Sequence, residues 1–269
     1  MPVTDAVDPV AATAHLAACV RDAGQLALSM FRTSVRQWNK EGSSPVSDAD
    51  IAVDRLLRER LTAPFPGTGW LSEESADDAS RLTARYVWIV DPIDGTRAFL
   101  ADLPDWTVSA ALVESGRPIS ACLFAPVTDE FFLASANNGA TCNGAAISVT
   151  HGASLAQARV AGPRNFISRL TSVAPELTIM PRVHSLALRF ARVAQGTLDI
   201  AIAGPDSHDW DLAAADLLVH EAGGALRRVG GGTVLYDGPE PRHGILLAAG
   251  RDRLDLLNEY LGDERLASL

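Results

Sequence analysis

The first sixty residues place apolar side chains at helical spacing. Asp8, followed by a proline, is typical of a helix start, and the apolar positions after it predict one long helix that extends to about Phe31. A second apolar face begins after Asp48 and predicts a helix that Pro64 ends. Residues 38–47 between the two helices are polar and rich in turn formers, which predicts a loop.

Further along the chain the pattern changes to short apolar runs separated by turn residues. These runs predict strands over residues 86–90, 108–113, 119–124, 131–134, 155–162, 177–183, 198–203 and 244–250. Helical spacing returns in three segments and predicts helices over residues 186–195, 210–222 and 254–261. Helices first, then clustered strands, then mixed elements predict a layered α+β or α/β architecture with a soft boundary near residues 145–155.

Length and composition narrow the class of protein. The 269 residues are 47% apolar and 21% charged, which excludes disordered, collagen-like and disulfide-scaffold chains. This length fits one large domain or two closely packed halves. With 33 acidic and 23 basic residues the net charge is −10, so we expect neither a nucleic-acid polymer nor a membrane as partner.

The N-terminal sequence, the length of the apolar runs and the cysteines bear on the compartment of the protein. The N-terminus has no basic region ahead of an apolar core, and the apolar runs are far shorter than the roughly 20 residues of a membrane helix. Cys19, Cys122 and Cys142 are odd in number and lack metal-binding spacing, which is typical of reduced, buried thiols. We therefore expect a cytoplasmic protein.

The richest chemistry follows the strand predicted over residues 86–90. There the chain reads Asp91-Pro92-Ile93-Asp94-Gly95-Thr96. Because the proline fixes the backbone, the two carboxylates and the Ile93 carbonyl can converge on one point, and such oxygen ligands suit a hard cation such as Mg²⁺. A helix beginning at Thr96 would add amides for a phosphate. An ordinary strand-ending turn remains the alternative for this segment alone.

Three more acidic residues could complete such a site. Asp50 lies near the start of the second predicted helix, Glu73 lies in a predicted loop, and Asp211 lies in the first turn of the helix predicted over residues 210–222. Each alone is explained by helix capping or by the helix dipole. Together with Asp91 and Asp94 they make five carboxylates, which can meet only if cations neutralise them.

These motifs resemble the inositol monophosphatase superfamily of Mg²⁺-dependent, often Li⁺-sensitive phosphomonoesterases. The resemblance runs from Lys40 to about Gly250 and rests on the Asp-Pro-Ile-Asp-Gly-Thr block, on Trp-Asp-Leu-Ala-Ala and on the later Glu-Ala-Gly-Gly. Ser-Glu-Glu-Ser at residues 72–75 stands where the family usually has Gly-Glu-Glu. The resemblance implies a layered αβαβα sandwich of the sugar-phosphatase type and a homodimer.

The resemblance also implies a role for each site residue and two or three bound Mg²⁺ ions. Glu73, Asp91 and the Ile93 carbonyl would bind the first ion, and Asp91, Asp94 and Asp211 the second. Asp50 and Thr96, with Glu73, would position or activate the attacking water around a third, weaker ion. The Gly95 and Thr96 amides, beside Asp94 and Asp211, would hold the phosphate of the substrate.

The implied halves divide the work. An N-terminal α+β half, residues 1–150, would carry most metal ligands, and a C-terminal α/β half, residues 151–269, would contribute Asp211 and substrate selectivity. The ions would offset much of the acidic excess, so that a small phosphorylated metabolite could enter one locally cationic cleft.

The substrate is predicted less directly. A glutamate that inositol phosphatases use for sugar hydroxyls is absent from residues 203–207, and His184-Ser185-Leu186 replaces the usual Gly-Thr-Ala. Residues 40–50 and 185–189 look more like 3′(2′),5′-bisphosphate nucleotidases of the CysQ type, in which Arg189 would meet a second phosphate. Hydrolysis of adenosine 3′,5′-bisphosphate to AMP and phosphate is therefore the expectation. The alternatives are an inositol-1-monophosphatase, a histidinol-phosphatase, or a metal-binding regulatory protein without turnover.

Overall fold

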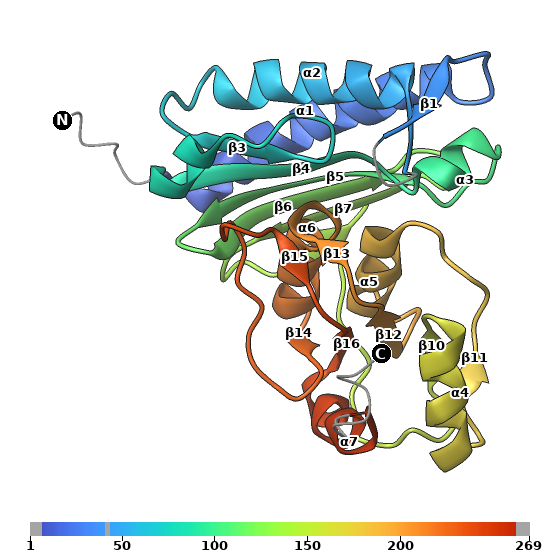
Figure 1. The fold of residues 1–269 in the computed structure, drawn as a ribbon. Helices are drawn as coiled ribbons and strands as arrows, with labels where there is room; N and C mark the ends of the chain where they lie inside the picture. The colour runs from blue at the N-terminus through green and yellow to red at the C-terminus, as the bar shows by residue number, and fades with distance from the viewer. Residues whose placement is uncertain (1–6, 41–43, 262–269) are drawn as a thin grey trace.

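Two helices near the N-terminus form one outer layer of the protein (Figure 1). The computed structural model describes residues 7–40 and 44–261. α1 (Pro9–Met30) begins where Asp8 accepts a hydrogen bond from the Val10 amide, and α2 (Asp48–Thr62) is capped by Ser47. Both predicted helices are confirmed.

The loop predicted over residues 38–47 is wrong at both ends. β1 (Gln37–Asn39) pairs antiparallel with β2 (Pro45–Ser47), so that Trp38 lies opposite Val46. All three side chains of β1 are exposed and both strands are short, which is why the polar composition did not indicate strands. Residues 41–43, at the tip, lie outside the described residues.

Beneath these helices, seven strands in the described part of the chain form the larger sheet. In spatial order they are β3 (Gly69–Ser72), β4 (Tyr86–Asp94), β5 (Thr107–Glu114), β6 (Arg117–Ala125), β7 (Glu130–Ser135), β8 (Ala140–Cys142) and β9 (Ala145–Ala146). β3 and β4 are parallel, and the other neighbours are antiparallel. The short elements η1 (Ala79–Thr83) and α3 (Thr96–Leu100) flank β4. The four strands predicted over residues 86–134 are confirmed, whereas β3, β8 and β9 were not predicted.

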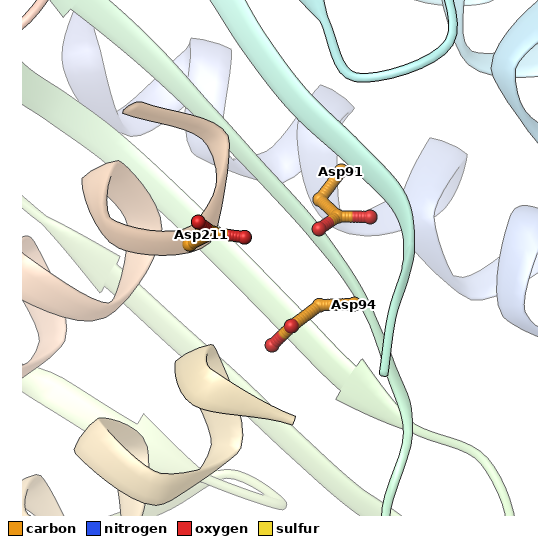
Figure 2. Close-up of side chains that lie close together, drawn as sticks. All are labelled: Asp91, Asp94 and Asp211. Carbon is orange, nitrogen blue, oxygen red and sulfur yellow. The ribbon is translucent and has the colours of Figure 1, made fainter. Parts of the chain in front are cut away.

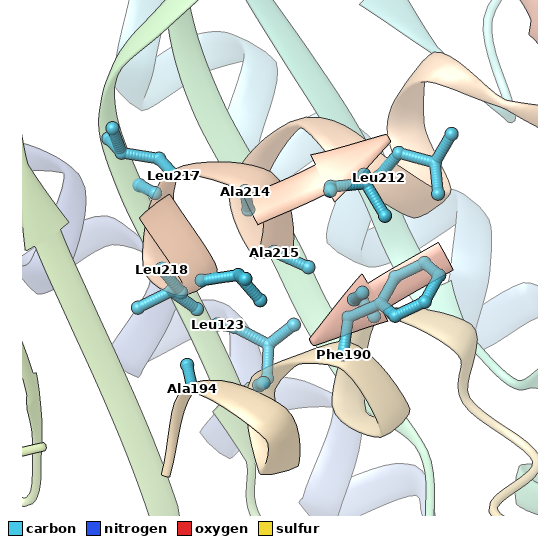
Figure 3. Close-up of a cluster of buried hydrophobic side chains, with 14 of the residues drawn as sticks. Leu123, Phe190, Ala194, Leu212, Ala214, Ala215, Leu217 and Leu218 are labelled. Carbon is cyan, nitrogen blue, oxygen red and sulfur yellow. The ribbon is translucent and has the colours of Figure 1, made fainter. Parts of the chain in front are cut away.

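α5 (Leu186–Ala194) and α6 (Asp209–Glu221) fill the middle layer between the two sheets (Figure 1). Small and branched side chains of α6 pack against Leu123 of the larger sheet and Phe190 of α5 (Figure 3). α6 is buried on nearly every side, because its run of alanines allows close approach of both sheets.

A smaller sheet and two further helices complete the layers. In the described residues its spatial order is β11 (Thr178–Ile179), β10 (Arg159–Ala161), β12 (Ile200–Ala203), β16 (Leu246–Gly250) and β14 (Gly224–Arg228). α4 (Arg164–Val173) and α7 (Arg251–Leu261) cover its outer face (Figure 1), and β13 (Ser207–His208) pairs with β15 (Arg242–His243). The predicted αβαβα sandwich is confirmed, although α4 was not predicted and the strand predicted over residues 177–183 shrinks to β11.

Three expectations concern the chain as a whole: its division into halves, its lack of membrane helices and the state of its cysteines. The larger sheet ends at residue 146 and the smaller one begins at residue 159, but α6 packs on both, and the division into halves at residue 150 stays a prediction. Within residues 7–40 and 44–261, none of the helices is long and apolar enough to cross a membrane. Cys19, Cys122 and Cys142 are free and buried, as expected.

Candidate active site

Three aspartates from distant parts of the sequence converge where β4 ends and α6 begins. Asp91, Asp94 and Asp211 each offer a carboxylate oxygen, and these oxygens lie within 4.8 Å of one another (Figure 2). Asp91 and Asp94 are almost completely buried, and Asp211 is partly exposed. The sequence therefore predicted correctly that these three side chains meet.

The end of β4 explains how Asp91 and Asp94 both face this point. Pairing with β5 is interrupted between the two residues, and the Ile93 amide donates to the Asp91 carboxylate at 3.0 Å. Gly95 then has φ of +94°, and a Cβ there would lie 3.3 Å from the Asp105 carbonyl oxygen. Glycine at this position allows the sharp turn and the close approach of neighbouring backbone.

Asp94 is held in place by the start of α5. Its carboxylate accepts hydrogen bonds from the Ser185 hydroxyl at 2.5 Å, the Ala187 amide at 2.7 Å and the Leu186 amide at 3.2 Å. Ser185 is completely buried and also caps α5 through the Leu188 amide. These hydrogen bonds hold both oxygens of the Asp94 carboxylate in place before any ligand binds.

Asp211 belongs to a helix cap. As the third residue of α6, it accepts a hydrogen bond from the His208 amide at 2.7 Å. The His208 ring stacks on Trp210, and its Nδ1 lies 3.9 Å from the Asp211 carboxylate. Burial lowers the pKa of His208, which favours the neutral ring.

The electrostatics of the three carboxylates favour the binding of a cation. Burial raises the pKa of Asp91 far above its usual range, and the charges of Glu73, Asp94 and Asp211 raise it further. Burial raises the pKa of Asp94 to about 6 despite its hydrogen bonds, and burial with the Asp94 charge raises the pKa of Asp211. Among the described residues, no lysine or arginine forms an ion pair with any of the three.

Asp50 and Thr96 form a second buried group beside the cluster. The Thr96 hydroxyl lies 3.1 Å from the Asp50 carboxylate and 3.0 Å from the Ile93 carbonyl oxygen. The other Asp50 oxygen accepts from the amide and hydroxyl of Ser47 at 2.8 and 2.6 Å. Burial raises the pKa of Asp50 even though these bonds oppose the shift. The predicted pair is therefore in contact.

Glu73 follows β3 directly and is tied to Lys40. The Lys40 ammonium donates to the carboxylates of Glu73 and Glu74 at 3.2 and 2.7 Å and to the Glu73 carbonyl oxygen at 3.1 Å. Burial raises the pKa of Glu73 and, to about 7, that of Glu74, while Lys40 opposes both shifts. A single ammonium thus compensates two carboxylates only in part.

One open cleft unites most of the predicted site residues. Its lining comprises Ser44, Pro45, Glu73, Asp91, Asp94, Gly95, Thr96, Arg97, Arg182, His184 and Asp211. Arg189 is not among them, because its guanidinium donates to the backbone carbonyls of Val183 and Ile202 at 2.7 and 3.0 Å. The role of Arg189 at a second phosphate stays a prediction.

Several residues that shape the site were not predicted from sequence. Ser47 and Ser185 orient Asp50 and Asp94, and Arg182 and His184 line the cleft. The serines carry a usable signal, because each stands at a helix start that the sequence predicts. His184 carries a signal only through the family resemblance, and Arg182 carries none, since only tertiary packing brings it to the cleft.

The donor set fits a hard divalent cation. The clustered donors are oxygen atoms alone, from three carboxylates that form no ion pair with a lysine or arginine among the described residues. Buried carboxylates in such proximity are stable when a cation offsets their charge. The site can hold a divalent metal.

Comparison with known proteins gives the family. A model described as the inositol monophosphatase family matches residues 7–264. An inositol monophosphatase from Dictyostelium discoideum is 33% identical over 225 residues, which cover 79% of this chain and 83% of that protein. A histidinol-phosphatase from Mycobacterium tuberculosis is 36% identical over 203 residues, 71% of this chain and 77% of that protein.

A solved structure agrees with this match. The extragenic suppressor protein SuhB from Bartonella henselae superposes with a TM-score of 0.84 at 26% identity, covering 94% of this chain and 99% of that chain. The chain therefore belongs to the inositol monophosphatase family and is a metal-dependent phosphomonoesterase that acts on a phosphorylated small molecule. These relatives give no support to the bisphosphate nucleotidase branch.

Proposed function

We propose that this member of the inositol monophosphatase family uses Mg²⁺ to hydrolyse the phosphate monoester of a small polyol, with inositol 1-phosphate as the expected substrate. The observation that carries the proposal is the cluster of Asp91, Asp94 and Asp211, whose pKa values are raised by burial and by the charges of neighbouring carboxylates. The similarity to an inositol monophosphatase over most of both chains favours a polyol ester. Inositol 1-phosphate therefore replaces adenosine 3′,5′-bisphosphate as the first expected substrate.

The residues divide between two or three metal positions. Glu73, Asp91 and the Ile93 carbonyl would hold one ion, and Asp91, Asp94 and Asp211 a second. The chemistry that Mg²⁺ supplies at such a site is acidification of the attacking water and neutralisation of charge on the phosphate and the leaving oxygen. The chain contributes the placement of these ligands, which Ser185 and the α6 cap fix in advance.

Asp50 and Thr96 would handle the proton of the attacking water. The Thr96 hydroxyl has one proton and two acceptors in reach, the Asp50 carboxylate and the Ile93 carbonyl. Ser47 holds Asp50 by its other oxygen, so that the carboxylate cannot turn away. Thr96 can therefore orient a water and pass its proton toward Asp50, with Glu73 sharing this task.

The phosphate itself would bind beside these groups. Gly95 and Thr96 line the cleft at the start of α3, and their amides are the predicted phosphate donors. Arg97 and Arg182 line the same cleft and are exposed, so they add positive charge for an anionic substrate. The same two arginines are the one observation that favours a second phosphate, and they keep bisphosphate nucleotidase as the second candidate function.

A substrate panel with purified protein tests the proposal. We expect Mg²⁺-dependent phosphate release from inositol 1-phosphate, at a kcat/KM above that for adenosine 3′,5′-bisphosphate, histidinol phosphate and fructose 1,6-bisphosphate. A higher kcat/KM for adenosine 3′,5′-bisphosphate would replace the proposal with the second candidate. Phosphate release that persists in excess chelator would contradict the metal assignment.

The cellular location and the oligomeric state of the enzyme are also part of the proposal. A cytoplasmic location follows from the reduced, buried cysteines. A homodimer follows from the family resemblance of the sequence. Sedimentation of the purified protein tests the second point, with a monomer at micromolar concentration as the contradicting result.

A further inference from the structure

A histidine–carboxylate pair lies at the cleft and is not explained by metal binding. The Asp105 carboxylate is 2.7 Å from the His184 ring Nδ1 and accepts the His184 backbone amide on the same oxygen at 2.6 Å. Both side chains are largely buried, with 15% of Asp105 and 29% of His184 exposed. Two bonds to one oxygen fix the His184 backbone and its ring at the same time.

The pair is joined to the metal-binding residues through the backbone. The Ser185 amide donates to the Asp105 carbonyl at 3.1 Å, and the Ser185 hydroxyl donates to Asp94. Gly95 makes this possible, because a Cβ there would lie 3.3 Å from both the Asp105 oxygen and the Ser185 nitrogen. His184 therefore lines the cleft one residue away from the group that orients Asp94.

The partner of Nδ1 decides what the rest of the ring can bind. A carboxylate only accepts hydrogen bonds, so Nδ1 carries the proton and the Nε2 of the neutral ring becomes an acceptor. Such an acceptor in the cleft binds a donor of the substrate, either a hydroxyl or an ammonium group. Because the proposed substrate is a polyol ester, we take this donor to be a hydroxyl.

We propose that His184, oriented by Asp105, is a specificity-determining residue that accepts a hydrogen bond from a hydroxyl of the leaving group next to the scissile phosphate ester. This inference rests on the proposed phosphomonoesterase function and narrows its substrate to hydroxylated alcohols. It also gives a role to the histidine that stands where the family usually has glycine in its Gly-Thr-Ala segment.

Two substrates that differ by hydroxyl groups alone test this role. Glycerol 2-phosphate carries a hydroxyl on each side of the ester carbon, and 2-propyl phosphate has the same skeleton without them. Loss of one neutral hydrogen bond corresponds to about a three- to tenfold change. We expect His184→Ala to lower kcat/KM for glycerol 2-phosphate by that factor and for 2-propyl phosphate by less than about twofold.

A matched histidine serves as the control. His151 is exposed and lies outside the cleft lining, so His151→Ala should leave both values unchanged. Equal losses for the two substrates in His184→Ala, or no loss for either, would overturn the inference.

The ring tautomer provides a readout that does not depend on turnover. Nitrogen NMR of the protein with labelled histidine should show His184 protonated at Nδ1 and unprotonated at Nε2, and a protonated Nε2 in the neutral ring would overturn the inference. In Asp105→Asn the amide can donate to Nδ1 and move the proton to Nε2. The preference for glycerol 2-phosphate should follow the tautomer, and a changed tautomer with an unchanged preference contradicts the proposal.

The outcomes also separate the inference from the proposed function. Native protein that hydrolyses both esters with Mg²⁺ at equal kcat/KM refutes the role of His184 and leaves the phosphatase intact. Native protein that hydrolyses neither ester, nor inositol 1-phosphate, refutes the proposed function, while the NMR result still decides the geometry of the pair.

Discussion

Buried aspartates in two regions of this protein have opposite charge environments. Asp199, just before β12, accepts hydrogen bonds from the Arg159 guanidinium at 2.9 Å and from the Thr150 hydroxyl. Burial alone would raise the pKa of Asp199, but these bonds outweigh it and lower the pKa to about 2. At the cleft, burial and neighbouring carboxylates raise the pKa values of Asp91, Asp94 and Asp211 instead.

The difference in charge environment distinguishes an aspartate that stabilises the fold from aspartates that are placed to bind a ligand. Where the chain supplies its own cation, as Arg159 does, a buried carboxylate stabilises the fold and needs no ligand. Where three carboxylates meet and none pairs with a lysine or arginine of the described residues, we expect a cost to the fold that a bound cation would offset. Exchanging aspartate for asparagine in each region should therefore have opposite consequences.

The largest expected effect is on turnover. Asp211→Asn keeps an oxygen that can accept the His208 amide but removes a negative ligand from the metal site. Because a Lewis-acid metal contributes several kcal/mol to such reactions, we expect kcat/KM for inositol 1-phosphate to fall by about three orders of magnitude. Steady-state phosphate release at saturating Mg²⁺ measures it. Turnover within tenfold of native would show that Asp211 is no ligand.

Metal binding should stabilise the native protein next most strongly. A ligand at 100 times its Kd adds about 2.7 kcal/mol to the free energy of unfolding. We expect a rise of that order on adding Mg²⁺ to chelator-treated protein in urea denaturation, and a clearly smaller rise or none for Asp211→Asn. Na⁺ at matched ionic strength is the control, and an equal rise with Na⁺ would reduce the effect to charge screening.

The paired aspartate should show acid-labile stabilisation. The pKa of Asp199 in the folded protein, about 2, is below its ordinary value of 3.8, so its contribution is present above about pH 4 and is lost as pH falls toward 2. Since Arg159 is partly exposed, solvent screening limits the contribution to about 1–2 kcal/mol. Asp199→Asn should lower the free energy of unfolding by this amount at pH 7 and not at pH 2. Unchanged kcat would confirm that Asp199 has no part in turnover.

The smallest expected effect is a rise, not a fall, in the free energy of unfolding when an aspartate is replaced. Without metal, Asp211→Asn removes a negative charge that Asp94 and Glu73 repel. We expect the metal-free variant to be more stable than metal-free native protein by about 1 kcal/mol at pH 7. Urea denaturation in chelator measures this difference, and a less stable variant would mean that the cluster is compensated within the chain.

Features that depend on local sequence patterns could be predicted, whereas features that depend on contacts between distant residues could not. β4 and α6 were predicted because a continuous apolar run and a helical apolar pattern are local properties, and the clustered aspartates lie directly at their ends. α4 was missed, since only Phe166, Ile167 and Leu170 are buried and no polar side chain caps its start. Two-residue strands such as β9 and β13 were missed because they are too short to show an alternating pattern.

The site shows the same limit. Asp91, Asp94 and Asp211 were predicted from residue types at element ends, but the bond from Ser185 to Asp94 joins residues 91 positions apart. Arg189 is a similar case, because the sequence does not indicate that its guanidinium donates to the backbone carbonyls of Val183 and Ile202. Tertiary packing decides such contacts, and a single sequence does not contain that information in readable form.

Calorimetric titration of Mg²⁺ into chelator-treated protein decides whether the cleft carboxylates form a metal site. We predict saturable binding of at least one ion per chain in native protein, retained in Asp199→Asn and abolished or weakened by more than tenfold in Asp211→Asn. Binding that is absent from native protein, or equal in native protein and Asp211→Asn, would contradict the assignment of Asp91, Asp94 and Asp211 as the metal ligands.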